Sequence, residues 1–145
     1  MDSTGNLYFT SGSSILELAN GVVTTFAGTG SPGFSGDNGP AASAQLSNPR
    51  GVFVDSTDAI WIADTGNRRI RKVSNGIITT VAGAAAPFPP VQLQFDADGP
   101  ATSVQLAAPQ AIAVDASGEA FFADDNRILV LIPSSSAAGT EQSVQ

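Results

Sequence analysis

The chain has 145 residues, enough for one domain, and its composition excludes several classes of protein. With 42% hydrophobic and 13% charged residues, it is too apolar for a disordered chain and too sparsely charged for a coiled coil. The net charge is −7, so we expect no nucleic-acid partner and no anionic membrane partner. The absence of Cys and His excludes disulfides, thiolate metal ligands and any Ser-His-Asp triad.

The first part of the chain contains three short β-rich runs, at 6–10, 14–18 and 22–26. Its opening residues have neither the basic region nor the long apolar run of a secretory signal. Asn20-Gly21 joins the last two runs and is the strongest short hairpin signal. We therefore predict a partial antiparallel unit over 1–28, whose three strands correspond to the second, third and fourth strands of the complete unit at 51–83.

Residues 29–50 are rich in Gly and Pro and predict a long connection between sheets. Within it, Pro40 stands at a plausible first helical position, ahead of AASAQL. We expect a short helical turn there, with Leu46 tucked beneath it.

The segment 51–83 is the complete unit, and tight turns separate its four β-rich runs. The first two runs are apolar on both faces, as inner strands are, and the last two carry more polar residues, as outer strands do. The basic run at 68–72 is interpreted as the solvated face of an outer strand. The four runs are GVFVD (51–55), IWIAD (60–64), RRIRKV (68–73) and IITTV (77–81).

A second connection is predicted over 84–110, and a partial unit of three strands over 111–132, with strands at 111–114, 119–123 and 127–132. Residues 133–145 are rich in Ser, Ala and Gln, which predicts a flexible tail.

The units repeat one another. NGVVTTFAG (20–28) matches NGIITTVAG (75–83) at six of nine positions, and GPAASAQLSNPRGVFVD (39–55) matches residues 99–115 at nine of seventeen. Four-stranded units that recur every 55–60 residues are typical of β-propeller blades. The ten predicted strands are too few to close a ring. We therefore expect the chain to belong to a longer polypeptide or to pack against copies of itself.

Two segments, TTFAGTGSPGFSGDNGPAASAQLSNPRGVFVD (24–55) and IWIADTGNRRIRKV (60–73), resemble the NHL repeat of bacterial proteins and of the propeller in teneurin-like surface proteins. The resemblance covers about residues 2–132. It implies an all-β fold, namely a partial β-propeller built from four-stranded antiparallel NHL-type blades, six-bladed when complete. It also implies a binding role, because NHL propellers are mostly interaction platforms for proteins. Some related propellers bind RNA through a basic face, or are lyases or lactonases that use His or metal ligands, and this chain has neither the basic face nor His.

Three polar residues recur in two of the units at the turn between the second and third strands. The first unit lacks all three together and has Ser11, Gly12 and Ser14 instead, which is what a paired charge predicts. We interpret the set as a structural clamp, in which each Asp bonds the Arg or amides of its own turn. The clamp residues are Asp64, Asn67 and Arg69 in the second unit and Asp124, Asn126 and Arg127 in the third.

The long connections hold the candidate binding residues, because loops on a rigid scaffold carry recognition. Their aromatic side chains are either contact residues or plugs that pin the loop to the propeller. Asp96 and Asp98 resemble the opening of a Ca²⁺ loop, but the later ligands are missing, so we predict neither a metal nor another cofactor. The candidate contact residues are Phe34, Asp37, Phe88 and Phe95.

These observations predict a non-catalytic protein-interaction or structural module that presents its connections to a protein partner, to other copies or to the rest of a longer chain. The alternative is a fragment of a propeller enzyme, lyase-like or lactonase-like, whose catalytic residues lie outside this chain. A third reading is a spacer in a secreted bacterial repeat protein. The resemblance to bacterial repeats predicts a secreted or cell-envelope location in a bacterium.

Overall fold

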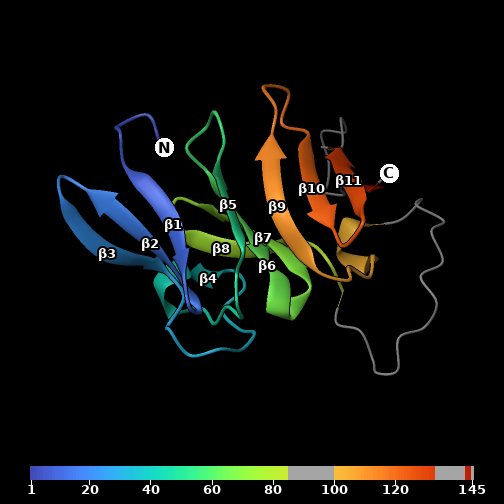
Figure 1. Cartoon of the computed structure of the whole chain (residues 1–145), viewed down its shortest axis with the longest axis horizontal. Coiled ribbons are helices and arrows are strands. Elements are labelled where there is room, and N and C mark those ends of the chain that lie inside the picture. The colour runs from blue at the N-terminus through green and yellow to red at the C-terminus, as the bar shows by residue number, and fades with distance from the viewer. Residues whose placement is uncertain (85–99, 133–142, 145) are drawn as a thin grey trace.

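The computed structural model describes residues 1–84, 100–132 and 143–144. It shows three antiparallel β-sheets that stand side by side along the longest axis of the molecule (Figure 1). The first sheet has the order β1 (Leu7–Ser11), β2 (Ser14–Ala19), β3 (Val22–Ala27). The second has the order β4 (Gly39–Pro40), β8 (Ile77–Ala82), β7 (Arg69–Ser74), β6 (Ile60–Asp64), β5 (Gly51–Val54). The third has the order β12 (Ser143–Val144), β11 (Arg127–Ile132), β10 (Ala120–Asp124), β9 (Pro109–Val114).

All ten expected strands are present, each within two residues of its expected bounds. The short helical turn expected in the first connection is the 3-10 helix η1 (Ala41–Ser43), with Leu46 fully buried. The repeat of that turn is η3 (Ala101–Ser103), and η2 (Thr65–Asn67) lies between β6 and β7.

Two further strands were not expected. Gly39 and Pro40 of the first connection form β4, which pairs with β8. The prediction of a flexible tail is wrong for Ser143 and Val144, which form β12 and pair with β11. Strand pairing uses backbone groups, so a stretch without an apolar pattern can still add to a sheet edge. The rest of the tail lies outside the described residues.

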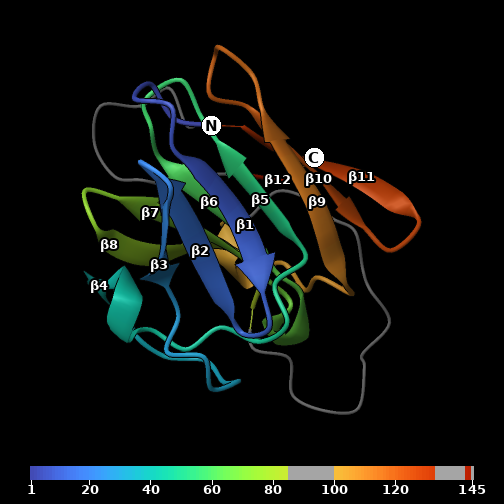
Figure 2. The same ribbon diagram turned by 60° about the vertical axis from the view of Figure 1, so that its left-hand side comes forward.

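Strands from all three sheets meet along one side of the molecule. β5 contacts both β1 and β9, and Figure 2 shows these three strands running side by side. Each sheet then extends outwards from this row. The arrangement is that of consecutive propeller blades.

Each sheet buries side chains against the next. On the middle sheet, the face toward the first sheet contains Ile60, Ile62, Val73 and Ile78, and we call this the leading face. The opposite, trailing face contains Trp61, Ala63, Ile70 and Ala82 and packs against the third sheet. The two faces follow from the two-residue period of a strand, so a strand between two sheets must be apolar at nearly every position.

The interpretation of the basic run 68–72 as the solvated face of an outer strand is wrong. β7 lies inside its sheet, between β8 and β6, and the side chains of Arg69 and Arg71 are buried. The polar composition of this strand has another cause. The first connection folds over the leading face of β7 and brings Asp37 to Arg71 and the ring of Phe34 to Arg69.

Gly28 shows how tightly the strands and connections meet. Its φ is +91°, and a Cβ there would lie 2.5 Å from the Ser13 carbonyl oxygen and 3.0 Å from Ser14 Cα. Gly21, in the β2–β3 hairpin, has a similar φ of +78° but open space around it.

We predict that Gly28→Ala destabilises the fold more than Gly21→Ala. Both changes place a side chain at positive φ, which costs about 1–2 kcal/mol. Only the first also forces a methyl group into main-chain atoms, which adds about 1–3 kcal/mol. Urea unfolding of the two variants measures the difference, and equal losses would contradict the close approach at Gly28.

Candidate functional site

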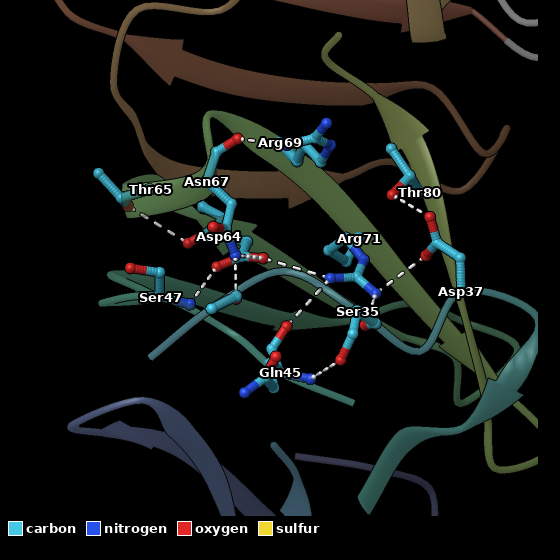
Figure 3. Close-up of polar contacts among 12 residues, drawn as sticks. Ser35, Asp37, Gln45, Ser47, Asp64, Thr65, Asn67, Arg69, Arg71 and Thr80 are labelled. Carbon is cyan, nitrogen blue, oxygen red and sulfur yellow. Dashed lines mark hydrogen bonds and ion pairs between the residues drawn. The ribbon is translucent and has the colours of Figure 1, made fainter. Parts of the chain in front are cut away.

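One polar network joins the first connection to the leading face of the middle sheet (Figure 3). Its centre is the buried guanidinium of Arg71, whose Nη2 lies 2.9 Å from Asp37 Oδ1. Its Nη1 lies 3.4 Å from Oδ2 of the equally buried Asp64. Arg71 also donates to the Ser35 carbonyl oxygen at 3.1 Å, and Thr80 Oγ1 donates to Asp37 Oδ2 at 2.7 Å. Arg71 Nη1 also donates to the Gln45 carbonyl oxygen at 3.5 Å, so a single strand residue binds the connection at three of its residues.

Asp64, the last residue of β6, holds the same connection from the other side. Its Oδ1 accepts a hydrogen bond from the Ser47 backbone N–H at 2.8 Å, and its Oδ2 accepts one from Asn67 Nδ2 at 2.8 Å. Asn67 Nδ2 also donates to the Gly33 carbonyl oxygen at 2.7 Å. Burial raises the pKa of Asp64, and this outweighs the opposite effect of its hydrogen bonds and of Arg71.

Of the contacts expected within the clamp, Asp64 bonds Asn67, but it does not pair with Arg69, which was one of the two kinds of partner expected for it. The two residues are direct cross-strand neighbours, but the Arg69 guanidinium lies over the ring of Phe34, 3.7 Å from its centroid. Arg69 Nη1 donates to the Asn67 carbonyl oxygen instead, at 2.9 Å. Burial, together with the charge of Arg71, lowers the pKa of Arg69. The Phe34 ring contacts the Arg69 guanidinium, which forms no ion pair of its own among the described residues. Arg71, two residues further along the same face, pairs with Asp64 instead.

Phe34 has the second of the two roles considered for it, that of a plug that pins its connection to the sheet. One face of its ring lies on Arg69, and Arg71 Cζ is 4.9 Å from the ring centroid, so the side chain pins the connection to the sheet. It nevertheless remains 43% exposed. The structure therefore holds an aromatic surface in a fixed position at the tip of the connection.

The third unit has the expected pair in a simpler form. Arg127 Nη2 lies 2.7 Å from Asp124 Oδ2, and Asp124 also accepts hydrogen bonds from the backbone N–H groups of Ala107 and Ala108. Asn126 is exposed. Leu129 occupies the place that Arg71 has in the middle sheet, since each is the cross-strand neighbour of the equivalent residue of the preceding strand.

A second set of polar residues, missed in the sequence, closes the turn before the second strand of each unit. Asp55 Oδ1 accepts from the Thr57 backbone N–H at 2.8 Å and from the Thr57 hydroxyl at 2.6 Å, and Oδ2 accepts from Trp61 Nε1 at 2.7 Å. Lys72 Nζ lies 3.4 Å from the same Oδ2. The signal was visible as Asp, then Ser or Thr two residues later, then an aromatic residue four further on. It occurs from Asp2 to Tyr8, from Asp55 to Trp61 and from Asp115 to Phe121.

The first unit uses this motif with a different partner. Tyr8 donates its hydroxyl toward both Asp2 Oδ2, at 3.0 Å, and Glu17 Oε1, at 2.8 Å. Burial and these two carboxylates raise the pKa of Tyr8. Glu17 occupies the place that Lys72 has in the second unit. The two units therefore share the Asp turn, but the side chain opposite the aromatic residue is acidic in the first unit and basic in the second.

Four of the candidate residues, namely Phe88, Phe95, Asp96 and Asp98, lie outside the described residues. Among the residues that the structure does describe, no three His, Cys, Asp or Glu side chains are grouped so as to hold a metal ion. In the same part of the chain, no helix is long and apolar enough to cross a membrane.

A family model described as the teneurin NHL domain matches residues 30–136, which include the network, the second sheet and strands β9 to β11 of the third. The chain belongs to the teneurin NHL domain family. Human Teneurin-1 is 35% identical over 98 residues, and the match covers 67% of this chain. The chloroplastic protein SUPPRESSOR OF QUENCHING 1 of Arabidopsis thaliana is 31% identical over an alignment of 125 residues, and the match covers 79% of this chain.

Solved structures share the fold. A structural-genomics protein of unknown function from Bacteroides thetaiotaomicron superposes with a TM-score of 0.66 over 96% of this chain, at 21% identity. The chain spans 31% of that protein, 4% of human Teneurin-1 and 11% of the Arabidopsis protein. The predictions of an NHL resemblance and of an all-β partial propeller are thus confirmed.

We predict that Arg71→Met destabilises the fold by about 3–5 kcal/mol, because it leaves Asp64 as a buried carboxylate without its cation. The matched control is Arg50→Met, at an exposed position. Adding Asp64→Asn to Arg71→Met should restore part of the loss, because the orphaned charge is then gone. Urea unfolding measures all four proteins, and an Arg71 variant as stable as the Arg50 variant would contradict the central role of this ion pair.

The second set of polar residues predicts a pH dependence. Burial by itself would raise the pKa of Asp55, but hydrogen bonds from Thr57 and Trp61 outweigh it and lower the pKa to about 2, from an ordinary 3.8. Since the folded-state pKa is the lower one, the ionised carboxylate contributes stability that is complete above about pH 4 and lost as the pH falls toward 2.

Asp55→Asn should therefore flatten the loss of stability between about pH 4 and pH 2, by about 2 kcal/mol. Thermal unfolding at a series of pH values measures the slope. Asp125→Asn, which makes the same charge change at an exposed residue, serves as the control. Parallel slopes for Asp55→Asn and the unmodified chain would show that this carboxylate is not the group that titrates.

Proposed function

We propose that the chain is a non-catalytic protein-interaction or structural module, an NHL-type propeller segment that presents its first connection to a protein partner. The observation that carries this proposal is the fixed, half-exposed ring of Phe34. Arg69 lies on one face of the ring, and the backbone on either side of it is bonded to Asn67 and Arg71 through Gly33 and Ser35.

A fixed aromatic side chain suits protein binding for an energetic reason. Aromatic residues dominate the binding energy of protein interfaces when they fill a pocket on the partner. A loop that is already ordered loses little conformational entropy on binding. The carboxylates around the ring, Asp37 and Asp64, are occupied by Arg71 and by hydrogen-bond donors, so they support the position of the loop.

The proposal includes a secreted or cell-envelope location in a bacterium. It is supported by the similarity of the repeats to bacterial ones. The curated relatives named above come from human and from a plant, and the solved structure with the same fold comes from a bacterium.

A photo-crosslinking experiment tests the proposal. Benzoylphenylalanine replaces Phe34 in the organism that makes the protein, and a control strain carries it at Phe9, which is similarly exposed at 39% but lies on the first sheet. We expect a discrete adduct between position 34 and a different protein, absent from the Phe9 strain. The partner is identified by mass spectrometry and purified.

Binding of the purified partner then decides whether Phe34 matters. Phe34→Ala should weaken the affinity at least about tenfold, as expected of an aromatic anchor. Phe34→Tyr keeps the ring on Arg69 and should bind like the unmodified chain. An unchanged affinity for the Phe34→Ala variant, with cooperative thermal unfolding retained, would overturn the proposed role of this connection.

A further inference from the structure

We propose that Asn75 is a site of spontaneous deamidation, a covalent change that alters the main chain of the β7–β8 hairpin. The chain contains three Asn-Gly pairs, at 20–21, 38–39 and 75–76. Pairs 38–39 and 75–76 both lie at the β8 edge of the middle sheet, which packs against another sheet on each face. The structure distinguishes these two pairs, and that distinction carries the inference. The proposal goes beyond the protein-binding role and does not depend on it.

The reaction takes place between neighbouring groups and consumes only water. The backbone nitrogen of Gly76 loses its proton to solvent base and attacks Cγ of Asn75, and the side-chain nitrogen leaves as ammonia. The product is a five-membered succinimide ring. Water then adds to one of the two ring carbonyl carbons and opens the ring. The residue becomes an aspartate or an isoaspartate, in which the main chain runs through Cβ. Glycine favours the attack because it has no side chain to shield its nitrogen.

The peptide group between Asn75 and Gly76 is free to take part in this reaction. Both residues are exposed and form the two-residue turn between β7 and β8. Their φ values are 51° and 76°, the two positive values of a tight hairpin turn. Among the described residues, none bonds the Asn75 carbonyl oxygen, the Asn75 side-chain amide or the Gly76 N–H. The rotation that brings the nitrogen onto Cγ therefore breaks no hydrogen bond of this peptide group.

The pair 38–39 has the same two residues in a different environment. Asn38 is exposed as well, so access to water does not separate the two sites. The Gly39 N–H donates to the Gly36 carbonyl oxygen at 3.0 Å, and the Asn38 N–H donates to the Ile78 carbonyl oxygen at 2.8 Å. The attacking nitrogen must first lose its hydrogen bond. At about 1 kcal/mol for one such bond, the reactive form is populated about fivefold less.

The isoaspartate product alters the attachment of the first connection. The Gly76 carbonyl oxygen accepts a hydrogen bond from the Ala41 N–H at 2.9 Å, and Ala41 is the buried first residue of η1. Pro40 of β4 pairs with Ile77 beside it. An isoaspartate inserts one extra main-chain atom before Gly76, so the turn no longer holds that carbonyl group in the same register. We expect the hydrogen bond from Ala41 to weaken.

Ageing of the purified full chain in mildly alkaline buffer tests the site. Mass spectrometry of proteolytic peptides follows deamidation at each position, and isoaspartyl methyltransferase identifies isoaspartate. Position 75 should react at least about fivefold faster than position 38. Asn48 is the internal control and should not react, because the following Pro49 has no N–H to attack with.

The same incubation in concentrated urea removes the structural difference between the two sites. Positions 38 and 75 should then react at similar rates, because each is an Asn followed by Gly in an unfolded chain. A folded chain that reacted equally at the two positions, or faster at position 38, would overturn the proposal.

Hydrogen exchange tests the consequence for the first connection. The Ala41 amide should exchange about fivefold faster in the aged chain than in the Asn75→Asp variant, which has the new charge but an ordinary main chain. The Gly83 amide donates to the Ala101 carbonyl oxygen in the other junction, at 3.1 Å, and should exchange equally in both. Equal protection of Ala41 in the aged chain and the variant would overturn the coupling to the first connection.

Discussion

The buried guanidinium of Arg71 is the constraint on which the first junction depends. A cation without exposure to water must have carboxylates and carbonyl oxygens around it, and these come from parts of the chain far apart in sequence. Asp64 is supplied by the neighbouring strand, whereas Asp37 and Ser35 are supplied by the connection. The charge therefore orders the connection, and with it the aromatic ring at its tip. Residues 33–37 of the connection are held by this ion pair and these hydrogen bonds, whereas Ala41, Ala44 and Leu46 of the same connection are buried in the core.

The three units have the same strand turn but stabilise it with different side chains. At the turn between the second and third strands, the first unit has Ser11 opposite Ser14, and Ser14 donates to the Gly28 carbonyl oxygen. The third unit has one ion pair, Asp124 with Arg127, and uses Leu129 where the second has Arg71. The backbone pairing is common to all three. What varies, among the described residues, is the set of side chains that make the polar contacts at this turn.

Stacking sheets on both faces sets the composition of the whole chain. Where a sheet has neighbours on both sides, its strands read as nearly continuous apolar runs, as β6 does. Among the described residues, most charged side chains lie at turns or in the polar pairs described above, in keeping with a charged fraction of only 13%.

The sequence by itself determined the strands, their antiparallel order within each unit, the repeat and the family, because these follow from short-range patterns. Alternation, Asn-Gly turns and repeated segments are all legible along the chain. The ion pair of Asp124 and Arg127 was also predictable from the sequence, because the two residues are three positions apart around one turn and their contact does not depend on the rest of the fold.

Only the tertiary structure decided that Arg71 rather than Arg69 pairs with Asp64, and that the basic strand is buried rather than solvated. Both outcomes depend on where residues 33–37 fold, about thirty-five residues away from β7. A polar residue in a strand has the same appearance in sequence whether it meets water or a carboxylate. Whether Arg71 is solvated or buried is decided by its long-range contact with residues 35–37, which excludes water from the guanidinium. The residues near Arg71 in the sequence do not indicate that contact.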